Sequence, residues 1–157
     1  MFTIVLVEPQ IPQNTGNIAR LCAATGATLH LVGTLGFSLD DKYLKRAGLD
    51  YWEHVHWQHF PSTEDYMAFC NPDQVHLLTT KSDTPYTNHQ FHPNDKLIFG
   101  SETKGIDEIY LRKYAEKTCT IPMKNKTAGV RSLNLSTSAG IVLYEAIRQQ
   151  GLDNSIR

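Results

Sequence analysis

Short apolar runs rich in β-branched residues alternate along the chain with longer segments of mixed polarity. Runs of this kind, bounded by Gly, Pro, Asn and Asp, are typical of buried strands. They occupy residues 2–7, 28–32, 75–79, 96–99 and 118–121. A weaker run around Val55 predicts one further strand.

Helical spacing of apolar residues marks the segments between these runs. Ile18 and Leu21 belong to one such pattern, which Gly26 ends. Asn14 or Thr15 is expected to cap this helix, and the two prolines of EPQIPQ are expected to keep the turn before it irregular. Further helices are predicted over residues 40–47, 63–69 after a Ser62 cap, 107–114 and 133–150.

The alternation of strands and helices predicts an α/β fold, with an open, mainly parallel sheet and helices on both faces. Such sheets bind ligands beyond the carboxyl ends of their strands. The polar turns that follow the strands are therefore where a site is expected. The tail after Gly151 is expected to fray.

Composition fits a single domain spanning residues 1–157, because 41% of the 157 residues are hydrophobic. Fifteen Lys and Arg stand against sixteen Asp and Glu, a formal net charge of -1. The overall charge therefore indicates neither nucleic acid nor membrane, and a polyanion has to meet a local patch. MFTIVLVEP is too short for a signal peptide, and no run approaches the roughly 18 apolar residues of a membrane span.

Disulfide and metal chemistry find little support. The three widely spaced cysteines are Cys22, Cys70 and Cys119. Without a C-x-x-C pair, they are expected to be buried, free thiols in a reducing cytosol. His54, His56 and His59 share the segment HVHWQH, but the segment itself contains no acidic or thiol ligand to complete a tetrahedral set. An amphipathic surface without metal is expected there.

Motifs of two common enzyme classes are missing. The first turn, EPQIPQNTGN, replaces the G-x-G-x-x-G of dinucleotide folds, and Lys104 of GSETKG falls on the wrong side of the glycine for a Walker loop. A hydrolase that uses Ser136 or Ser138 with one of the seven histidines is an alternative, although no G-x-S-x-G elbow surrounds either serine.

Three polar segments follow three of the predicted strands. They are PQNTGNIARLCAATGA, KLIFGSETKGI and CTIPMKNKTAGVRSLNLSTSAGIVLYEA. In order and spacing they resemble the motifs of the SpoU branch of the SPOUT RNA methyltransferases, most closely its short single-domain members. The resemblance covers nearly the whole chain, including DDKYLKRAGLDYWEH and LTTK.

The resemblance implies a 2'-O-methyl transfer from S-adenosyl-L-methionine to the ribose of the wobble nucleotide, position 34, in tRNA, with S-adenosyl-L-homocysteine as product. The nucleotide is a cytidine or a modified uridine, usually in leucine isoacceptors. The implied fold is of the SPOUT type, with a C-terminal trefoil knot that no pattern argument predicts. A cytoplasmic homodimer that binds the tRNA anticodon stem-loop without metal completes these expectations.

The resemblance also assigns site residues. Its catalytic positions fall on Arg20, Asn134 and Glu102. Its cofactor positions fall on Leu78, Thr79, Gly100, Ile121, Met123, Ser132 and Leu133. Substrate contacts are expected at Asn14, Asn17, Ser136 and Tyr144, the last in tRNA binding or dimer contact, and from their charge at Lys124 and Lys126. Gly100 is expected to let the backbone approach the adenine ring.

The catalytic positions leave several roles open. A guanidinium is a poor general base, so Arg20 either activates the hydroxyl, as the resemblance implies, or clamps a phosphate and stabilises charge on the 2'-oxygen. Glu102 is expected to organise the GSETKG turn rather than to transfer a proton. Asn134 either orients Arg20 or the ribose, or caps the final helix.

Two basic clusters offer places for RNA phosphates. They are Lys42, Lys45 and Arg46 on one short helix, and Lys124, Lys126 and Arg131 in the loop before the last motif. A solvated basic surface is the alternative for each. For the whole chain, a noncatalytic RNA-binding or assembly factor with the same fold is the alternative from another class.

Overall fold

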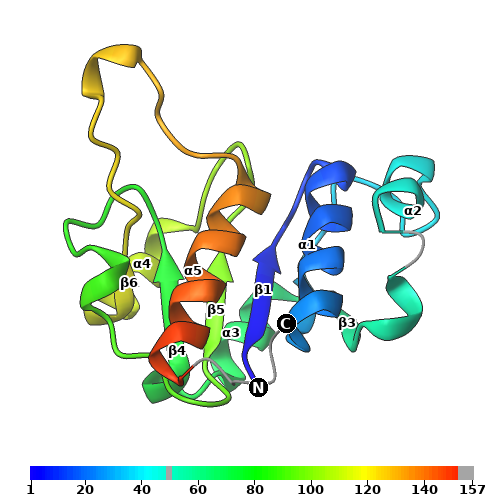
Figure 1. Cartoon of the computed structure of the whole chain (residues 1–157), viewed down its shortest axis with the longest axis horizontal. Helices are drawn as coiled ribbons and strands as arrows, with labels where there is room; N and C mark the ends of the chain where they lie inside the picture. The colour runs from blue at the N-terminus through cyan, green and yellow to red at the C-terminus, as the bar shows by residue number, and fades with distance from the viewer. Residues whose placement is uncertain (49–50, 152–157) are drawn as a thin grey trace.

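A computed structural model describes residues 1–48 and 51–151 and contains one parallel sheet (Figure 1). Its strands lie in the order β3-β2-β1-β5-β4-β6, and each neighbouring pair is parallel. They are β1 (Thr3–Val7), β2 (Thr28–Val32), β3 (Trp57–Phe60), β4 (Val75–Leu78), β5 (Lys96–Phe99) and β6 (Thr118–Cys119). The predicted open parallel sheet is confirmed. The tail after Gly151 lies outside the described residues.

Helices cover both faces of the sheet, as predicted. They are α1 (Pro12–Thr25), α2 (Lys42–Gly48), α3 (Thr63–Phe69), α4 (Glu108–Lys113) and α5 (Leu135–Gln149). Helices α1 and α5 lie on one face, and α3 and α4 lie on the other (Figure 1). Helix α2 covers neither face and packs against the outer side of α1.

The central strand β1 is buried from both sides. Ile4 and Leu6 pack in the core under α1 and α5, whereas Val5 and Val7 pack in the core under α3 and α4. Burial of each such side chain contributes about 1.5–3 kcal/mol. A strand covered on both faces therefore appears in the sequence as a continuous apolar run rather than an alternating one.

The N-terminus of α1 differs from the prediction. The helix begins at Pro12 after the N-cap Ile11, which makes no side-chain cap hydrogen bond, so neither Asn14 nor Thr15 caps it. Proline suits the first turn because it needs no N–H partner there and its φ is already helical. The prediction of an irregular turn is therefore wrong at Pro12. Gly26 ends the helix at φ 74°, as predicted.

The strand predicted around Val55 begins two residues later, at Trp57. Val55 is buried at the end of the 3-10 turn η1 (Trp52–His54), where burial gives it the same apolar signature as a strand residue. Of the three neighbouring histidines, only His59 lies on β3. Within residues 1–48 and 51–151, no group of three or more metal-ligating side chains is assembled.

Other local predictions agree with the structure. The Ser62 hydroxyl accepts from the Asp65 N–H at 3.1 Å and caps α3. The three cysteines are free and buried, and burial raises the pKa of Cys22 to about 12. One helix start differs from the prediction. Helix α5 begins two residues later than predicted, because Asn134 is its N-cap.

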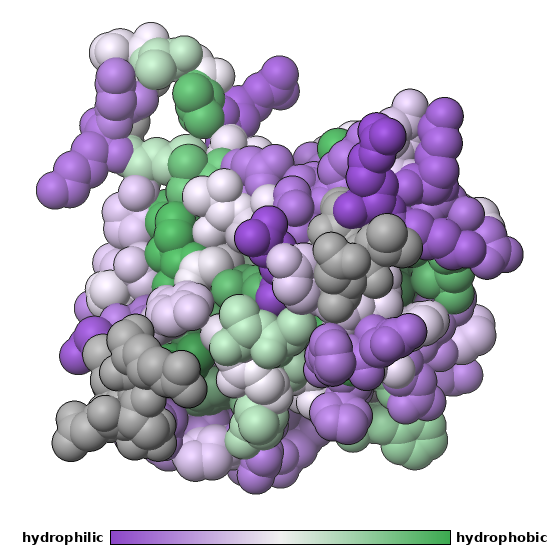
Figure 2. Space-filling model, turned by 45° about the vertical axis from the view of Figure 1, so that its right-hand side comes forward, coloured by the Kyte–Doolittle hydropathy of each residue, from purple (hydrophilic) through white to green (hydrophobic). Residues whose placement is uncertain are grey.

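Two segments project beyond the carboxyl end of the sheet, one between β2 and β3, which carries α2, and one between β6 and α5. The segment between β6 and α5 projects beyond the sheet and returns to it (Figure 1). Figure 2 shows this segment standing clear of the remaining surface, and hydrophilic side chains over the corner that carries α2. No helix in the described part of the chain has the length and apolar character needed to cross a membrane.

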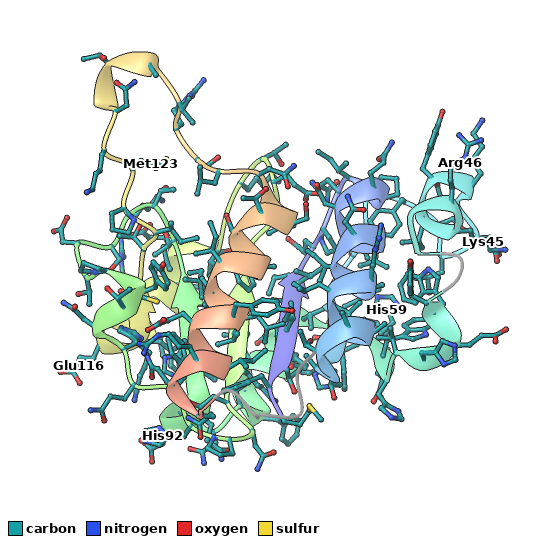
Figure 3. The ribbon with its side chains drawn as sticks, viewed as in Figure 1. Lys45, Arg46, His59, His92, Glu116 and Met123 are labelled. Atoms are coloured by element: carbon teal, nitrogen blue, oxygen red, sulfur yellow. The ribbon has the colours of Figure 1, made fainter. Side chains whose placement is uncertain are left out.

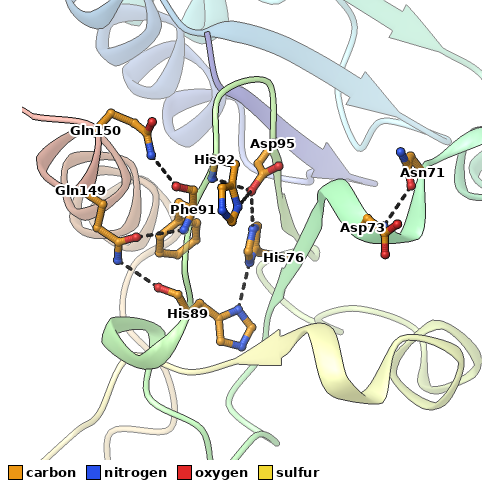
Figure 4. A network of polar contacts seen from close by, with 9 residues as sticks. All are labelled: Asn71, Asp73, His76, His89, Phe91, His92, Asp95, Gln149 and Gln150. Carbon is orange, nitrogen blue, oxygen red and sulfur yellow. Dashed lines mark hydrogen bonds and ion pairs between the residues drawn. The ribbon is translucent and has the colours of Figure 1, made fainter.

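A polar cluster joins the opposite end of the sheet to α5 (Figure 4). His76 Nε2 lies 2.8 Å from an Asp95 carboxylate oxygen, and His76 Nδ1 lies 2.9 Å from His89 Nδ1. Because a carboxylate only accepts, we assign the proton of a neutral His76 to Nε2, and its Nδ1 accepts from His89. Gln149 of α5 donates to the His89 carbonyl and accepts from the Phe91 N–H, each at 2.9 Å.

This cluster predicts a loss of stability in acid. Burial lowers the pKa of His76 and of His89 in the cluster. Burial also lowers the pKa of His30, which lies outside the cluster on β2, to about 4. The unfolded chain binds protons below the ordinary pKa of about 6.5, while the folded protein keeps these rings neutral. The stabilisation is therefore present above pH 6.5 or so and is lost as the pH falls below it.

In urea titrations, we expect the free energy of unfolding to fall by at least about 1 kcal/mol between roughly pH 7.5 and pH 5. The variant His56→Gln, which changes an exposed ring, serves as the control and is expected to follow the same curve. A free energy of unfolding that stays constant over this range would contradict the assignment of neutral, buried rings.

Candidate functional site

A cavity of about 490 Å³ opens at the carboxyl ends of β4 and β5. Its walls come from the turns after β1 and β4, the loop after β5, and the projecting segment with the start of α5. Parallel α/β sheets bind ligands at this edge. The volume lies within the range of about 300–1,000 Å³ that is typical of small-molecule sites.

All seven predicted cofactor positions line this cavity. They are Leu78, Thr79, Gly100, Ile121, Met123, Ser132 and Leu133. Asn14, Glu102 and Asn134 line it as well. Figure 3 shows Met123 where the projecting segment leaves the body of the protein. The motifs thus come together at one place, although they are distant in sequence.

Several other residues that line the cavity were not among the predicted positions. They include Thr80, Lys81, Phe99, Ser101 and Thr103. All five lie in or beside LTTK and KLIFGSETKGI, so their position next to a matched motif was the available signal. Nothing in these residue types alone points to a ligand.

The closure of its own loop requires glycine at position 100. A Cβ at this position would lie 2.0 Å from the Gly105 carbonyl carbon and 2.2 Å from the Ile106 nitrogen. The loop closes on itself there, and the Gly105 N–H donates to the Ser101 carbonyl at 3.0 Å. Closure of the loop by itself therefore excludes a side chain, and the approach of this backbone to an adenine ring stays a prediction.

The carboxylate of Glu102 holds the turn after β1. Its Oε1 accepts from the Gln10 N–H and its Oε2 from the Ile11 N–H, each at 2.8 Å, and Oε2 also accepts from Asn14 Nδ2 at 3.2 Å. These N–H groups immediately precede Pro12, and the carboxylate supplies an acceptor for each of them. The geometry fits the structural role expected of Glu102, but the turn that it organises joins β1 to α1 rather than GSETKG.

A hydrogen bond between two asparagines joins α1 to α5. Asn134 Nδ2 donates to Asn14 Oδ1 at 3.0 Å. Asn134 Oδ1 accepts from the N–H groups of Ser136 at 2.9 Å and Thr137 at 3.2 Å, which makes Asn134 the N-cap of α5. In the described residues Asn134 makes no hydrogen bond to Arg20, so its amide serves Asn14 and the cap instead.

Arg20 lies outside the cavity, in an open groove between α1 and α5. The groove is lined by Asn17, Arg20, Leu21, Ala24, Ser136, Thr137 and Gly140. The Ser136 hydroxyl donates to Asn134 Oδ1 at 2.6 Å, so this hydrogen-bonded pair stands between cavity and groove. Because the Ser136 hydroxyl engages an amide, it does not form the serine–histidine pair that a hydrolase requires.

Among the described side chains, those of Lys124 and Tyr144 line neither space. Lys124 is exposed on the projecting segment and Tyr144 is 51% exposed on α5. The side chain of Lys126 lies outside the described residues. Lys45 and Arg46 occupy the corner opposite the projecting segment (Figure 3). The two basic clusters therefore lie on opposite sides of the carboxyl end of the sheet.

Comparison with known proteins gives one consistent relationship. Residues 1–144 match the sequence profile of the SpoU rRNA Methylase family. The tRNA (cytidine(34)-2'-O)-methyltransferase of Methylovorus glucosotrophus (strain SIP3-4) is 45% identical over 157 residues, which cover 99% of this chain and 100% of that protein.

Two solved structures are also similar. One, described as structural insights into the 2-OH methylation of C/U34 on tRNA, has a TM-score of 0.88 and 40% identity, and the match covers 96% of each chain. The SpoU methyltransferase AviRb from Streptomyces viridochromogenes, in complex with the cofactor AdoMet, has a TM-score of 0.79 and 25% identity. That match covers 94% of this chain and 60% of AviRb.

The Glu102 contacts predict a measurable stability effect. Glu102→Ala leaves two backbone N–H groups without their acceptor, so we expect the free energy of unfolding in urea to fall by about 1–2 kcal/mol. Glu108→Ala is the matched control, because the Glu108 carboxylate pairs with exposed Lys81. We expect the control to cost less than about 0.5 kcal/mol. Equal losses in the two variants would contradict the role assigned to Glu102.

Loop closure at Gly100 predicts a second effect. Gly100→Ala forces a Cβ into the Gly105 backbone, so the free energy of unfolding should fall by about 1–3 kcal/mol in thermal or urea unfolding. Gly140 of α5 provides the control, because a Cβ added there meets nothing within 4 Å. Gly140→Ala should stabilise the helix by up to about 1 kcal/mol. An unchanged stability of Gly100→Ala would show that the loop can open without cost.

Proposed function

The chain belongs to the SpoU rRNA methylase family, and from this premise we propose that it transfers a methyl group from S-adenosyl-L-methionine to the ribose 2'-oxygen of nucleotide 34 in tRNA. The name of the Methylovorus relative and the solved structure concerned with C/U34 support the position of the methyl group. The AdoMet complex of AviRb supports the identity of the methyl donor.

The residues of the cavity fit this cofactor. Leu78, Ile121 and Leu133 supply apolar walls for an adenine ring, and backbone groups of the closed Gly100 loop face the same space. When bound, the cofactor supplies a methyl group on a positively charged sulfonium, and S-adenosyl-L-homocysteine is the product. The cavity therefore has the size and the mixed polarity that the proposed reaction needs.

The chain itself contributes position and charge. The reaction requires the 2'-oxygen in line with the methyl carbon and shielded from water, and positioning of this kind supplies much of a catalysed rate. Arg20 lies beside the cavity rather than in it, which supports a role for its charge on the RNA side of the reaction. Since a guanidinium stays protonated, we assign Arg20 to clamping a phosphate beside nucleotide 34 and stabilising negative charge on the 2'-oxygen.

The observation that carries the proposal is the chain of hydrogen bonds Glu102–Asn14–Asn134. It connects the loop after β5, the start of α1 and the cap of α5, and all three of its members line the cavity. A noncatalytic RNA-binding factor has no need of such a braced cavity behind an RNA-binding surface. This favours the enzyme over that alternative.

For the RNA, we propose the tRNA anticodon stem-loop, with cytidine or a modified uridine at position 34, in leucine isoacceptors. Lys45 and Arg46 lie at one corner of the molecule and Lys124 lies on the projecting segment at the other, which supports a phosphate backbone that passes between them (Figure 3). Asn17 and Ser136 border the groove in which the reacting nucleotide would lie. Lys124 would reach the RNA from the projecting segment.

For the whole molecule, we propose a cytoplasmic homodimer in which residues 1–157 form one domain. Tyr144, which is exposed on α5 and does not line the groove, supports a dimer contact beside it. We also propose the trefoil knot of SPOUT proteins. The segment after β4 supports it. The Tyr86 N–H donates to the Thr120 carbonyl at 2.8 Å, so this segment contacts the chain before the projecting segment. The His89 carbonyl accepts from Gln149, so the same segment also contacts the chain after the projecting segment.

Methyl transfer to total tRNA with labelled cofactor tests the function directly. The wild-type protein should label tRNA, and mapping should place the label on the ribose of nucleotide 34. Arg20→Ala should lower turnover by about 100-fold or more, because charge on the 2'-oxygen loses its partner. Cofactor affinity should survive, because Arg20 lies outside the cavity.

Arg112→Ala is the control, since Arg112 is exposed on α4 and distant from the groove. It should methylate tRNA at the wild-type rate. Tight tRNA binding without methyl incorporation would favour the noncatalytic alternative. Label at another nucleotide would overturn the assignment to position 34, and near-normal turnover of Arg20→Ala would overturn its role.

A further inference from the structure

We propose that Tyr51 is a positioning residue that holds the guanidinium of Arg20 in the groove, an inference that rests on the proposed function. The Arg20 Cζ lies over the Tyr51 ring, 5.3 Å from its centroid. This is within the distance of about 6 Å at which a cation is attracted to an aromatic face. The motif comparison did not assign Tyr51 to the site.

Arg20 needs a holding contact because it is exposed at the groove. A free arginine side chain has many rotamers, and holding one of them costs conformational entropy. Within residues 1–48 and 51–151, its guanidinium makes no hydrogen bond and no ion pair. Among the described residues, the Tyr51 ring is therefore the contact that limits where the guanidinium can lie.

An aromatic ring suits this task better than a carboxylate. The guanidinium carries its five N–H donors in its plane, whereas a ring contacts its face. Contact with the ring leaves the in-plane donors available for a phosphate or for the 2'-oxygen. A carboxylate would occupy these donors and neutralise the charge that the reaction needs.

The backbone of Tyr51 is itself held in place. Its carbonyl accepts from the His54 N–H at 2.9 Å, at the start of η1. The next residue, Trp52, packs against the main core and meets Trp57 edge-on at 5.3 Å. Since η1 and α2 pack against α1, the excursion between β2 and β3 brings an anchored aromatic ring to the helix that carries Arg20.

Kinetics of ring-removing and ring-keeping variants test the inference. Tyr51→Leu should lower kcat for tRNA methylation about 10-fold. This loss lies between the few-fold effect of removing one exposed cation–π contact and the roughly 100-fold loss of rate when a catalytic group is misplaced. KM for S-adenosyl-L-methionine should not change. Tyr51→Phe, which keeps the ring, should stay within about 2-fold of wild type. Phe69→Leu, which removes an exposed ring on α3, is the control and should be fully active.

A double-mutant cycle separates positioning from a general structural role. If Tyr51 acts through Arg20, adding Tyr51→Leu to Arg20→Ala should cause no further loss of turnover. The Arg20 side-chain NMR signals should show ring-current shifts in the wild type and in Tyr51→Phe, and should lose them in Tyr51→Leu. This readout does not depend on activity.

Full activity of Tyr51→Leu, an equal loss in Tyr51→Phe, or a further loss in the Arg20→Ala background would each overturn the inference while leaving the proposed function intact. A wild-type protein that methylates no tRNA would overturn the proposed function, and the inference with it. The two failures are therefore distinguishable in one set of assays.

Discussion

The bond on which the site depends joins the Glu102 carboxylate to the backbone N–H groups of Gln10 and Ile11. Helix α1 begins with a proline and has no side-chain cap of its own, so its approach to the sheet has to be fixed from elsewhere. Glu102 supplies that constraint from a loop about ninety residues later in the chain. Through Asn14 the same carboxylate is connected to Asn134, which caps α5.

This constraint gives the carboxyl end of the sheet two adjoining spaces with different character. The cavity combines apolar walls with loop backbone, whereas the groove between α1 and α5 carries the exposed charge of Arg20. The hydrogen-bonded pair Asn134 and Ser136 lies between them. In the proposed function, the methyl donor binds in the cavity and the RNA binds at the groove. Only the ribose 2'-oxygen has to reach from the groove to the methyl group in the cavity.

Stability and function are divided between the two ends of the sheet. At the end away from the cavity, neutral His76 and its hydrogen-bond partners join β4 to the last turn of α5 (Figure 4). At the cavity end, charge is kept at the surface on Arg20 and on the basic clusters. Both ends hold α5, at its cap through Asn134 and at its last turn through Gln149, so this helix joins the two regions.

The sequence by itself determined the order of strands and helices, the stop at Gly26, the cap at Ser62 and, through its motifs, the residues that line the cavity. These features depend on local propensity, or on motifs that are contiguous in the chain. Only the tertiary structure decided that Pro12 begins α1 and that Val55 is buried by a turn.

The tertiary structure also decided that Gly100 serves loop closure and that Tyr51 meets Arg20. Each of these outcomes depends on a contact with a specific neighbour, and Glu102 and Asn134 reach Asn14 across 88 and 120 residues. A side chain in the sequence shows what it can bond to, but not which distant partner the fold will place beside it. That is why the sequence could assign the predicted cofactor positions, whereas the hydrogen bonds that connect Glu102, Asn14 and Asn134 could not be predicted.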